Sequence, residues 1–507
     1  MCVFRLRRFV SCSVLLVFSL FITQLSYAGY NGPRLEQKEI NQLLDELEAD
    51  PGWLPKNIEK VGQLRVDQFK DVIEYLDFTH YTFLHPVRIK GEEISDLIGT
   101  KVERMTVWSV RGGELKPIPH QIDEYDSKLG WIYVPGVSPA KVSGEYQVLD
   151  DPDELIFMYR DTSKSRYDAA SMNQIDGKVY KELKFVPKIG PARYAYIVMD
   201  SSARSDADYA SIDLGKDETT ISTMFYTIKS DPKSFIDFRD FNAHIGPAQG
   251  TTIVDNIRVS ASAGILAKWA RGTLDNDNIR IHLVGAHDGA VRVASLAKLE
   301  ILFAGVQIFS LYTQVNFYDQ GIHIPNRTEL GSASYFASVL RDPSIEVALD
   351  FVDVTGADVS AASVWADHGA IAVDGVMTDI EKEVNDIPLP GSWVWLDSKQ
   401  GWNVFMKISL PPEMTEGMGT AMLYEDDPDS FNDYEKYPGA NPRIGIKTRG
   451  LPDAIETFHE LELDIGIWFP DTVGDAGPAV FDDEVNNPPN LSVTDLANVK
   501  ECCVAGM

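Results

Sequence analysis

"NIRIHLVGAHDGAVRVASLAKLEILFAGVQIFSLYTQVNFYD", residues 278 to 319, is the stretch of sequence that decides the fold. It consists of long apolar runs that are broken mainly at glycines and at one Asp-Gly pair. Apolar runs bounded by turn residues indicate β-strands that are joined by tight turns. Residues 299 to 316 are nearly continuously apolar, which predicts strands that are covered on both faces.

The same β-like pattern continues on both sides of this stretch. Alternating apolar residues begin at His85, and further runs lie at 181–187, 192–200, 255–272 and 345–356. Residues 391–412 read as a hairpin, and no alternation of strands with helices occurs. We therefore predict a mainly β protein built from large antiparallel β-sandwich domains, with a short N-terminal helical hairpin.

Changes in composition divide the chain. A length of 507 residues predicts several domains, and residues 200–217 are polar and rich in turn-forming residues. We expect five parts: a signal peptide at 1–28, a helical hairpin at 29–80, an N-terminal β-sandwich domain at 81–215, a large β-sandwich domain at 216–470 and a flexible C-terminal tail at 471–507.

The N-terminus has the features of a secretory signal. Arg5, Arg7 and Arg8 precede an apolar run at residues 9–22, and small residues stand before a cleavage point after Ala28. The alternative is a retained membrane anchor, but the apolar run is short for a membrane span. We expect a periplasmic or extracellular protein that has no membrane span once the signal is removed.

Charge and cysteine content restrict the function further. The formal net charge of -30 repels phosphate backbones, so the sequence argues against nucleic-acid partners. It suits a soluble exported protein, and it also suits a protein that binds cations. Cys2 and Cys12 leave with the signal, so Cys502 and Cys503 remain, either as a surface tether or as an ordinary feature of the tail.

Two acidic turns are candidates for a metal site. "PIPHQIDEYD", residues 117–126, and "LDDPDELIFMYRD", residues 149–161, each follow or precede an expected strand. Brought together, they could supply carboxylate oxygens to a hard cation such as Ca²⁺. The alternative is ordinary turn chemistry, in which Asp side chains accept backbone N–H bonds. The candidate calcium ligands are Asp123, Glu124, Asp150, Asp151 and Asp153.

These two phrases resemble segments of uncharacterised secreted bacterial β-sandwich proteins. "AHDGAVRVAS", residues 286–295, is similar to a strand of supersandwich domains in carbohydrate-active enzymes, although Ala290 stands where that pattern usually has Pro. The resemblance implies an exported sandwich that handles glycans. It carries over no catalytic residue.

Aromatic residues in the expected hairpin are candidates for a sugar platform. Trp393 and Trp395 share one strand face, and the turn brings Trp402 onto the partner strand. Indole rings stack on sugar rings, but the same arrangement also builds a sandwich core. Together with His120 and Arg292 these residues are the candidate ligand-binding set.

Two hypotheses for function follow. The first is an exported β-sandwich protein with a binding or structural role in the cell envelope, which binds a glycan or an envelope protein and is stabilised by calcium. The alternative is a carbohydrate-active enzyme, a polysaccharide lyase or glycoside hydrolase. The sequence has no H-E-x-x-H, G-x-S-x-G or Walker motif, which favours the first hypothesis and leaves catalysis open.

Overall fold

A computed structural model of the chain describes residues 36–49, 66–243, 252–265, 271–303, 305–329, 340–362, 369–385, 393–411, 419–427, 441–449, 460–470 and 477–496. The expected signal peptide and the Cys502-Cys503 pair lie outside these residues. Within them, no helix is long and apolar enough to cross a membrane.

Three helices precede the first strand: α2 (Gln37–Ala49), α5 (Val66–Tyr75) and α6 (His80–Leu84). Helices α2 and α5 lie inside the predicted hairpin, and each buries its apolar face, with Leu43 and Ile73 among the buried residues. Helix α6 was not predicted. Thr79 begins it with a capping box, in which the Thr79 hydroxyl accepts a hydrogen bond from the backbone N–H of Thr82.

Two small antiparallel sheets form the N-terminal part of the molecule. The first has the strand order β1-β5-β4, and the second has the order β26-β6-β7-β2-β3. Their strands are β1 (Pro86–Lys90), β2 (Met105–Arg111), β3 (Glu114–Pro117), β4 (His120–Asp123), β5 (Glu154–Met158), β6 (Lys178–Val186), β7 (Arg193–Met199) and β26 (Asn490–Asp495).

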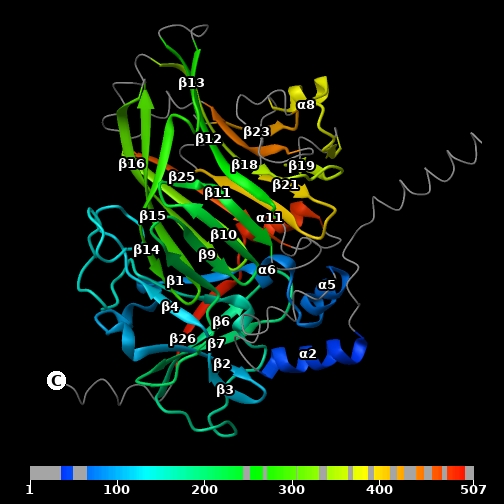
Figure 1. Ribbon diagram of the computed structural model, residues 1–507. Helices are drawn as coiled ribbons and strands as arrows, with labels where there is room; N and C mark the ends of the chain where they lie inside the picture. The colour runs from blue at the N-terminus through cyan, green and yellow to red at the C-terminus, as the bar shows by residue number, and fades with distance from the viewer. Residues whose placement is uncertain are drawn as a thin grey trace, which may run out of the picture.

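Two nine-stranded sheets form the large sandwich (Figure 1). The first sheet contains β8 (Ala210–Leu214), β9 (Thr219–Thr223), β10 (Tyr226–Asp231), β11 (Ser234–Ala243), β12 (Val254–Ile265), β13 (Arg271–Leu274), β18 (Leu340–Phe351), β23 (Gly419–Glu425) and β24 (Arg443–Arg449). The second contains β14 (Ile279–Asp288), β15 (Arg292–Phe303), β16 (Val306–Tyr318), β17 (Gly321–Glu329), β19 (Asp358–Ala361), β20 (Ile371–Ala372), β21 (Trp393–Asp397), β22 (Asn403–Ser409) and β25 (Glu460–Trp468).

The core of the sandwich lies between these two sheets. Phe235 of β11 meets Phe317 of β16 with ring centroids 6.1 Å apart, and Tyr226 of β10 meets Phe469 at 5.6 Å. The strand pairs within both sheets are antiparallel, as in β15 and β16, where Arg292 is opposite Tyr318. The predicted fold class, a mainly β protein of large antiparallel sheets, is confirmed.

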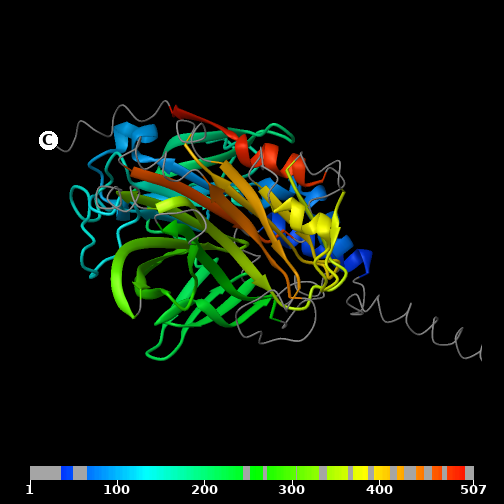
Figure 2. The same ribbon diagram turned by 90° about the horizontal axis from the view of Figure 1, so that it is seen from above.

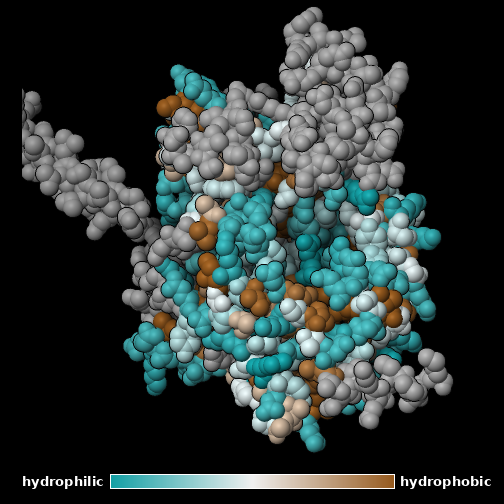
Figure 3. All heavy atoms as spheres, turned by 180° about the vertical axis from the view of Figure 1, so that it is seen from behind, coloured by the Kyte–Doolittle hydropathy of each residue, from teal (hydrophilic) through white to brown (hydrophobic). Residues whose placement is uncertain are grey.

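The surface is polar over most of the back face. There, hydrophobic side chains gather in a band across the middle (Figure 3), at the height where the small sheets meet the sandwich in Figure 1. Hydrophilic side chains dominate the rest of the described surface in this view. The distribution fits the strongly acidic composition.

The sequence-based division of the chain needs two corrections. Strand β8 pairs with β9 in the large sheet, so the sandwich begins by Ala210 and not at residue 216. The prediction of a flexible tail from 471 is wrong for residues 478–495, because α11 (Pro478–Asn486) and β26 occupy this segment. Pro478 is the first residue of the helix. Strand β26 is six residues long and pairs with β6 at the edge of its sheet.

Helix α11 packs against the N-terminal helix α6 and against the large sandwich. Phe481 is 2% exposed, and its ring centroid lies 4.8 Å from Phe405 of β22 and 5.6 Å from Tyr81 of α6. Seen from above, the red α11 lies beside the blue N-terminal elements (Figure 2). One aromatic side chain therefore joins the C-terminal helix, the N-terminal helix and the large sandwich.

We expect Phe481→Ala to lower the free energy of unfolding by about 3–5 kcal/mol, because the substitution leaves a cavity beside the rings of Tyr81, Phe405 and Trp468. Urea unfolding followed by tryptophan fluorescence measures the loss. Tyr75→Ala is the matched control, since Tyr75 is 59% exposed and should change stability little. Equal effects of the two substitutions would contradict the packing of α11.

Candidate functional site

Arg292 joins the stretches that the sequence singled out. Its side chain is buried at the start of β15, where Nε donates to Asp123 Oδ2 at 2.8 Å and Nη2 donates to Glu154 Oε2 at 2.8 Å. The side-chain amide oxygen Oε1 of Gln121 accepts hydrogen bonds from the backbone N–H groups of Val291 and Arg292 at 2.7 and 2.9 Å. The phrases at 117–126, 149–161 and 286–295 thus meet in one buried polar joint.

Asp123 is the anionic centre of this joint. Burial raises its pKa, but Arg292 and His287 outweigh that effect and hold the pKa below the usual range. His287 Nε2 lies 3.2 Å from Asp123 Oδ1, and this contact raises the pKa of His287. Because the ion pair is buried and saturated with hydrogen bonds, it fixes two parts of the fold to each other.

Two of the other predicted calcium ligands, Asp153 and Glu124, accept hydrogen bonds from backbone N–H groups in turns. The Asp153 carboxylate accepts from the backbone N–H groups of Tyr125 at 2.9 Å and Asp150 at 2.7 Å, and Glu124 accepts from the N–H of Gln147. These contacts match the turn alternative. In the described part of the chain, no group of three or more His, Cys, Asp or Glu is arranged to hold a metal ion. Calcium binding, with Asp151 among the proposed ligands, stays a prediction.

The predicted ligand-binding residues do not come together. His120 Nδ1 lies 2.9 Å from the carbonyl oxygen of Ile118, and burial lowers the pKa of His120. Trp393, Trp395 and Trp402 are buried in the core, with Trp402 stacked on Phe351 at 6.0 Å. The three indoles therefore form sandwich core, which was the open alternative, and they form no exposed platform.

Residues 124–153 are a long connection that covers the second large sheet. Residues 131–134 lie outside the sheets and make one isolated bridge, between Tyr125 and Ile132. Ile132 exchanges two backbone hydrogen bonds with the side chain of Gln314, at 3.2 and 2.9 Å. Trp131 and Val134 pack on Leu296. The connection ties the N-terminal part to β15 and β16.

A pocket of about 240 Å³, which sequence reasoning missed, lies where α6, β1 and α11 meet the outer face of β17, β25 and β22. Its lining mixes aromatic, cationic and hydrogen-bonding side chains. The described polar and aromatic lining residues are Tyr81, His85, Arg88, Tyr318, His323, Lys407, Ser409, Asp464 and Trp468.

Gly466 leaves room at the floor of the pocket. It pairs with His323 of β17 on one side and with Lys407 of β22 on the other. A Cβ atom at Gly466 would lie 2.2 Å from the six-membered ring of Trp468, so only glycine lets this indole lie down along β25. Trp468 is partly exposed and lines the pocket.

Polar groups line the same pocket as this indole. His323 Nε2 lies 2.5 Å from Asp464 Oδ1, and burial would raise the pKa of Asp464, but His323 holds it below the usual range. Burial and the nearby Arg88 lower the pKa of His85 to about 3, so this imidazole is neutral. Its Nδ1 lies 2.9 Å from the hydroxyl of Tyr81. The pocket thus offers both acceptors and donors of hydrogen bonds.

The buried joint supports the pocket. Arg292 Nη1 donates to the hydroxyl of Tyr318 at 2.8 Å, and Tyr318 lines the pocket. One sequence signal marked the floor. Asp464, Gly466 and Trp468 lie at spacing two on one face of β25, while Leu463, Ile465 and Ile467 lie on the other. The opposite wall comes from residues hundreds of positions away, so no local pattern shows it.

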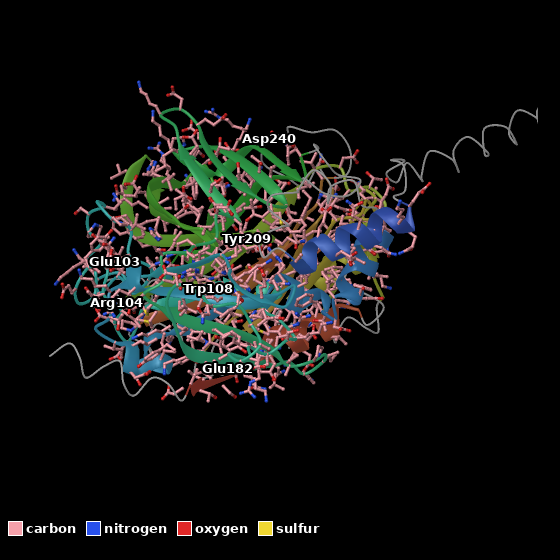
Figure 4. The ribbon with its side chains drawn as sticks, turned by 90° about the horizontal axis from the view of Figure 1, so that it is seen from below. Glu103, Arg104, Trp108, Glu182, Tyr209 and Asp240 are labelled. Atoms are coloured by element: carbon pink, nitrogen blue, oxygen red, sulfur yellow. The ribbon has the colours of Figure 1, made fainter. Side chains whose placement is uncertain are left out.

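A second buried polar group lies at the same junction. Tyr209 donates to Asp161 Oδ1 at 2.8 Å, and its ring lies 4.6 Å from the guanidinium of Arg160, which is ion-paired with Asp319. Figure 4 shows Tyr209 near the middle of the molecule, whereas Glu103 and Arg104 lie at the rim. This group also joins the N-terminal part to the sandwich.

Comparisons with known proteins give distant structural likenesses. No protein-family model matches the chain, and no curated protein matches its sequence. It is similar to an α-mannosidase from Enterococcus faecalis V583, with 9% identity, a TM-score of 0.41 and coverage of 83% of this chain and 45% of that one. A protein in glycosyl hydrolase family 38 from Enterococcus faecalis gives 10% identity, a TM-score of 0.40, and coverage of 83% and 47%.

The chain therefore spans less than half the length of these two similar structures. The first is named as an α-mannosidase, and the second as a protein in glycosyl hydrolase family 38. With TM-scores below 0.5, the likenesses assign no activity to this chain.

We expect Arg292→Met to lower the free energy of unfolding by about 3–5 kcal/mol, because it leaves Asp123 buried without its main partner. Chemical denaturation measures this loss. Arg104→Met is the control: the Arg104–Asp200 pair is about half exposed on both sides and should contribute less than about 1 kcal/mol. A loss of that small size for Arg292 would contradict its role in the joint.

Asp161 should make stability depend on pH. Burial raises its pKa from 3.8 to about 6, although Arg160 and Arg111 partly oppose the rise. The folded state keeps the proton up to about pH 6, whereas the unfolded chain loses it near pH 3.8. The free energy of unfolding should therefore fall as pH rises through this window, by up to about 3 kcal/mol. Unfolding curves of wild type and Asp161→Asn between about pH 4 and pH 7 measure the difference, and a constant difference would contradict it.

Proposed function

We propose that this chain is an exported carbohydrate-binding protein, and that one sugar residue occupies the pocket between α6, β1, α11 and the outer face of the large sandwich. The observation that carries the proposal is the indole of Trp468 lying along β25 among the polar groups of Asp464, His323 and Ser409. Aromatic surface next to hydrogen-bonding groups suits a sugar ring, which has apolar C–H faces and polar hydroxyls.

The size of the pocket supports a single ring. A volume of about 240 Å³ lies below the range of pockets for drug-sized ligands, about 300–1,000 Å³. A free monosaccharide or the end of a glycan chain fits such a space better than an internal segment of a polymer. The glycan partner and the cell envelope location expected from the sequence are part of this proposal.

The lining favours binding over glycoside hydrolysis. Hydrolases of the usual kind place two carboxyl groups on either side of the glycosidic bond. Among the described residues that line the pocket, Asp464 is the one carboxylate, and it is engaged by His323. We therefore propose sugar binding as the function, with glycoside hydrolysis as the alternative.

We expect the protein to bind monosaccharides at this pocket, and Asp464→Asn to weaken binding by about tenfold, because a charged acceptor contributes about 1.5–3 kcal/mol. Isothermal titration calorimetry against a panel of neutral and acidic monosaccharides measures the affinities. Asp397→Asn is the matched control, since Asp397 lies on β21, pairs with Lys399 and does not line the pocket.

Three results would contradict this function. They are no binding by any sugar of the panel, equal effects of the two Asp substitutions, and release of new reducing ends from polysaccharides, which would instead establish an enzyme. Melting temperatures of both variants, compared with wild type, distinguish lost contacts from lost folding.

A further inference from the structure

The wall of the pocket carries an arginine, Arg88, whose charge is attracted by Glu154 and Asp464 without a direct ion pair to either. Arg88 lies on β1, on the strand face opposite the buried Val87 and Ile89. It lines the pocket and is exposed to solvent. Among the described residues it makes no hydrogen bond and no ion pair.

The carboxylates nearest to Arg88 are already engaged elsewhere. Asp464 is held by His323 at 2.5 Å, and Glu154 is held by Arg292 at 2.8 Å. Lys407, the lysine that lines the pocket together with Arg88, is ion-paired with Asp482 and donates a hydrogen bond to Asn486 at 2.7 Å. Arg88 thus keeps its N–H donors for a group that comes from outside the chain.

We propose that the ligand of this pocket is an acidic sugar whose carboxylate binds Arg88. This inference rests on the proposed function and narrows its substrate class. A guanidinium presents its donors as a planar fork that matches a carboxylate at two points, which neutral hydroxyls do not. The sugar ring would lie against Trp468, with its hydroxyls toward Asp464 and Ser409, while the acid group faces β1.

The overall negative charge of the protein does not favour an acidic sugar, so the preference for one must come from contacts inside the pocket. A chain with a net charge of -30 repels anions at long range, so it would slow the approach of an acidic sugar. Salt screens such long-range repulsion at distances beyond about 10 Å, but it screens a contact inside a pocket much less. The affinity for the carboxylate therefore depends on Arg88 and on the hydrogen bonds it forms.

Glucuronate and glucose are the matched probes, because they differ only in the carboxylate at one carbon. We expect wild type to bind glucuronate at least about tenfold more tightly than glucose, since hydrogen bonds to charged groups contribute about 1.5–3 kcal/mol. Arg88→Gln should remove this preference and leave the affinity for glucose within about threefold. Titration calorimetry measures all four affinities.

Arg280→Gln is the control variant. Arg280 lies on β14, is also exposed, and does not line the pocket. It should leave both affinities unchanged. Melting temperatures near that of wild type confirm that both variants are folded.

The outcomes separate this inference from the function beneath it. Equal binding of glucose and glucuronate, or a preference that survives in Arg88→Gln, overturns the acidic ligand and leaves the sugar-binding function standing. Absence of binding by every sugar of the panel, glucose and glucuronate included, overturns the function itself. Tighter binding of an oligosaccharide that ends in glucuronate than of the free sugar assigns the end of a glycan chain, and equal binding of the two assigns the free sugar; both support the inference.

Discussion

The buried ion pair between Arg292 and Asp123 is the interaction on which the rest of the structure depends. Arg292 begins β15, in the middle of the stretch that defines the large sandwich, and Asp123 ends β4 of the N-terminal part. Glu154, Gln121 and Tyr318 satisfy the remaining donors and acceptors. A charge pair in such surroundings tolerates only one relative position of its two sides, so it orients the small sheets on the large one.

That orientation is what creates the pocket. The floor is the outer face of a sheet, where Gly466 provides a gap between taller side chains. The walls belong to α6, β1 and α11, which reach this face only because the N-terminal part is fixed there. Tyr318 belongs to the buried joint and to the pocket, since its hydroxyl accepts a hydrogen bond from Arg292 and its side chain lines the pocket. A change in the joint should therefore reach the pocket through this side chain.

The sequence predicted the fold class because alternation and turn residues are local signals. Near the joint it also singled out candidate site residues, but it assigned them to calcium or to a ligand. They are His120, Asp123, Glu124, Asp150, Asp151, Asp153 and Arg292. Periodicity shows which residues share a strand face, and it does not show that Gln121 and Asp123, rather than Ile122, point to the more buried side. The pocket could not be predicted, because Arg88 and Asp464 are 376 positions apart in the printed sequence and meet only through tertiary packing.

The pairing of β26 with β6 has a consequence for biosynthesis. Residues 490–495, near the end of the chain, complete a sheet whose other strands lie between residues 105 and 199. Until the ribosome has made this last strand, the edge of β6 stays open to pairing with other chains. The N-terminal part can therefore reach its final form only after residues 490–495 have been synthesised, and a chain that lacks them should be the species most prone to aggregate.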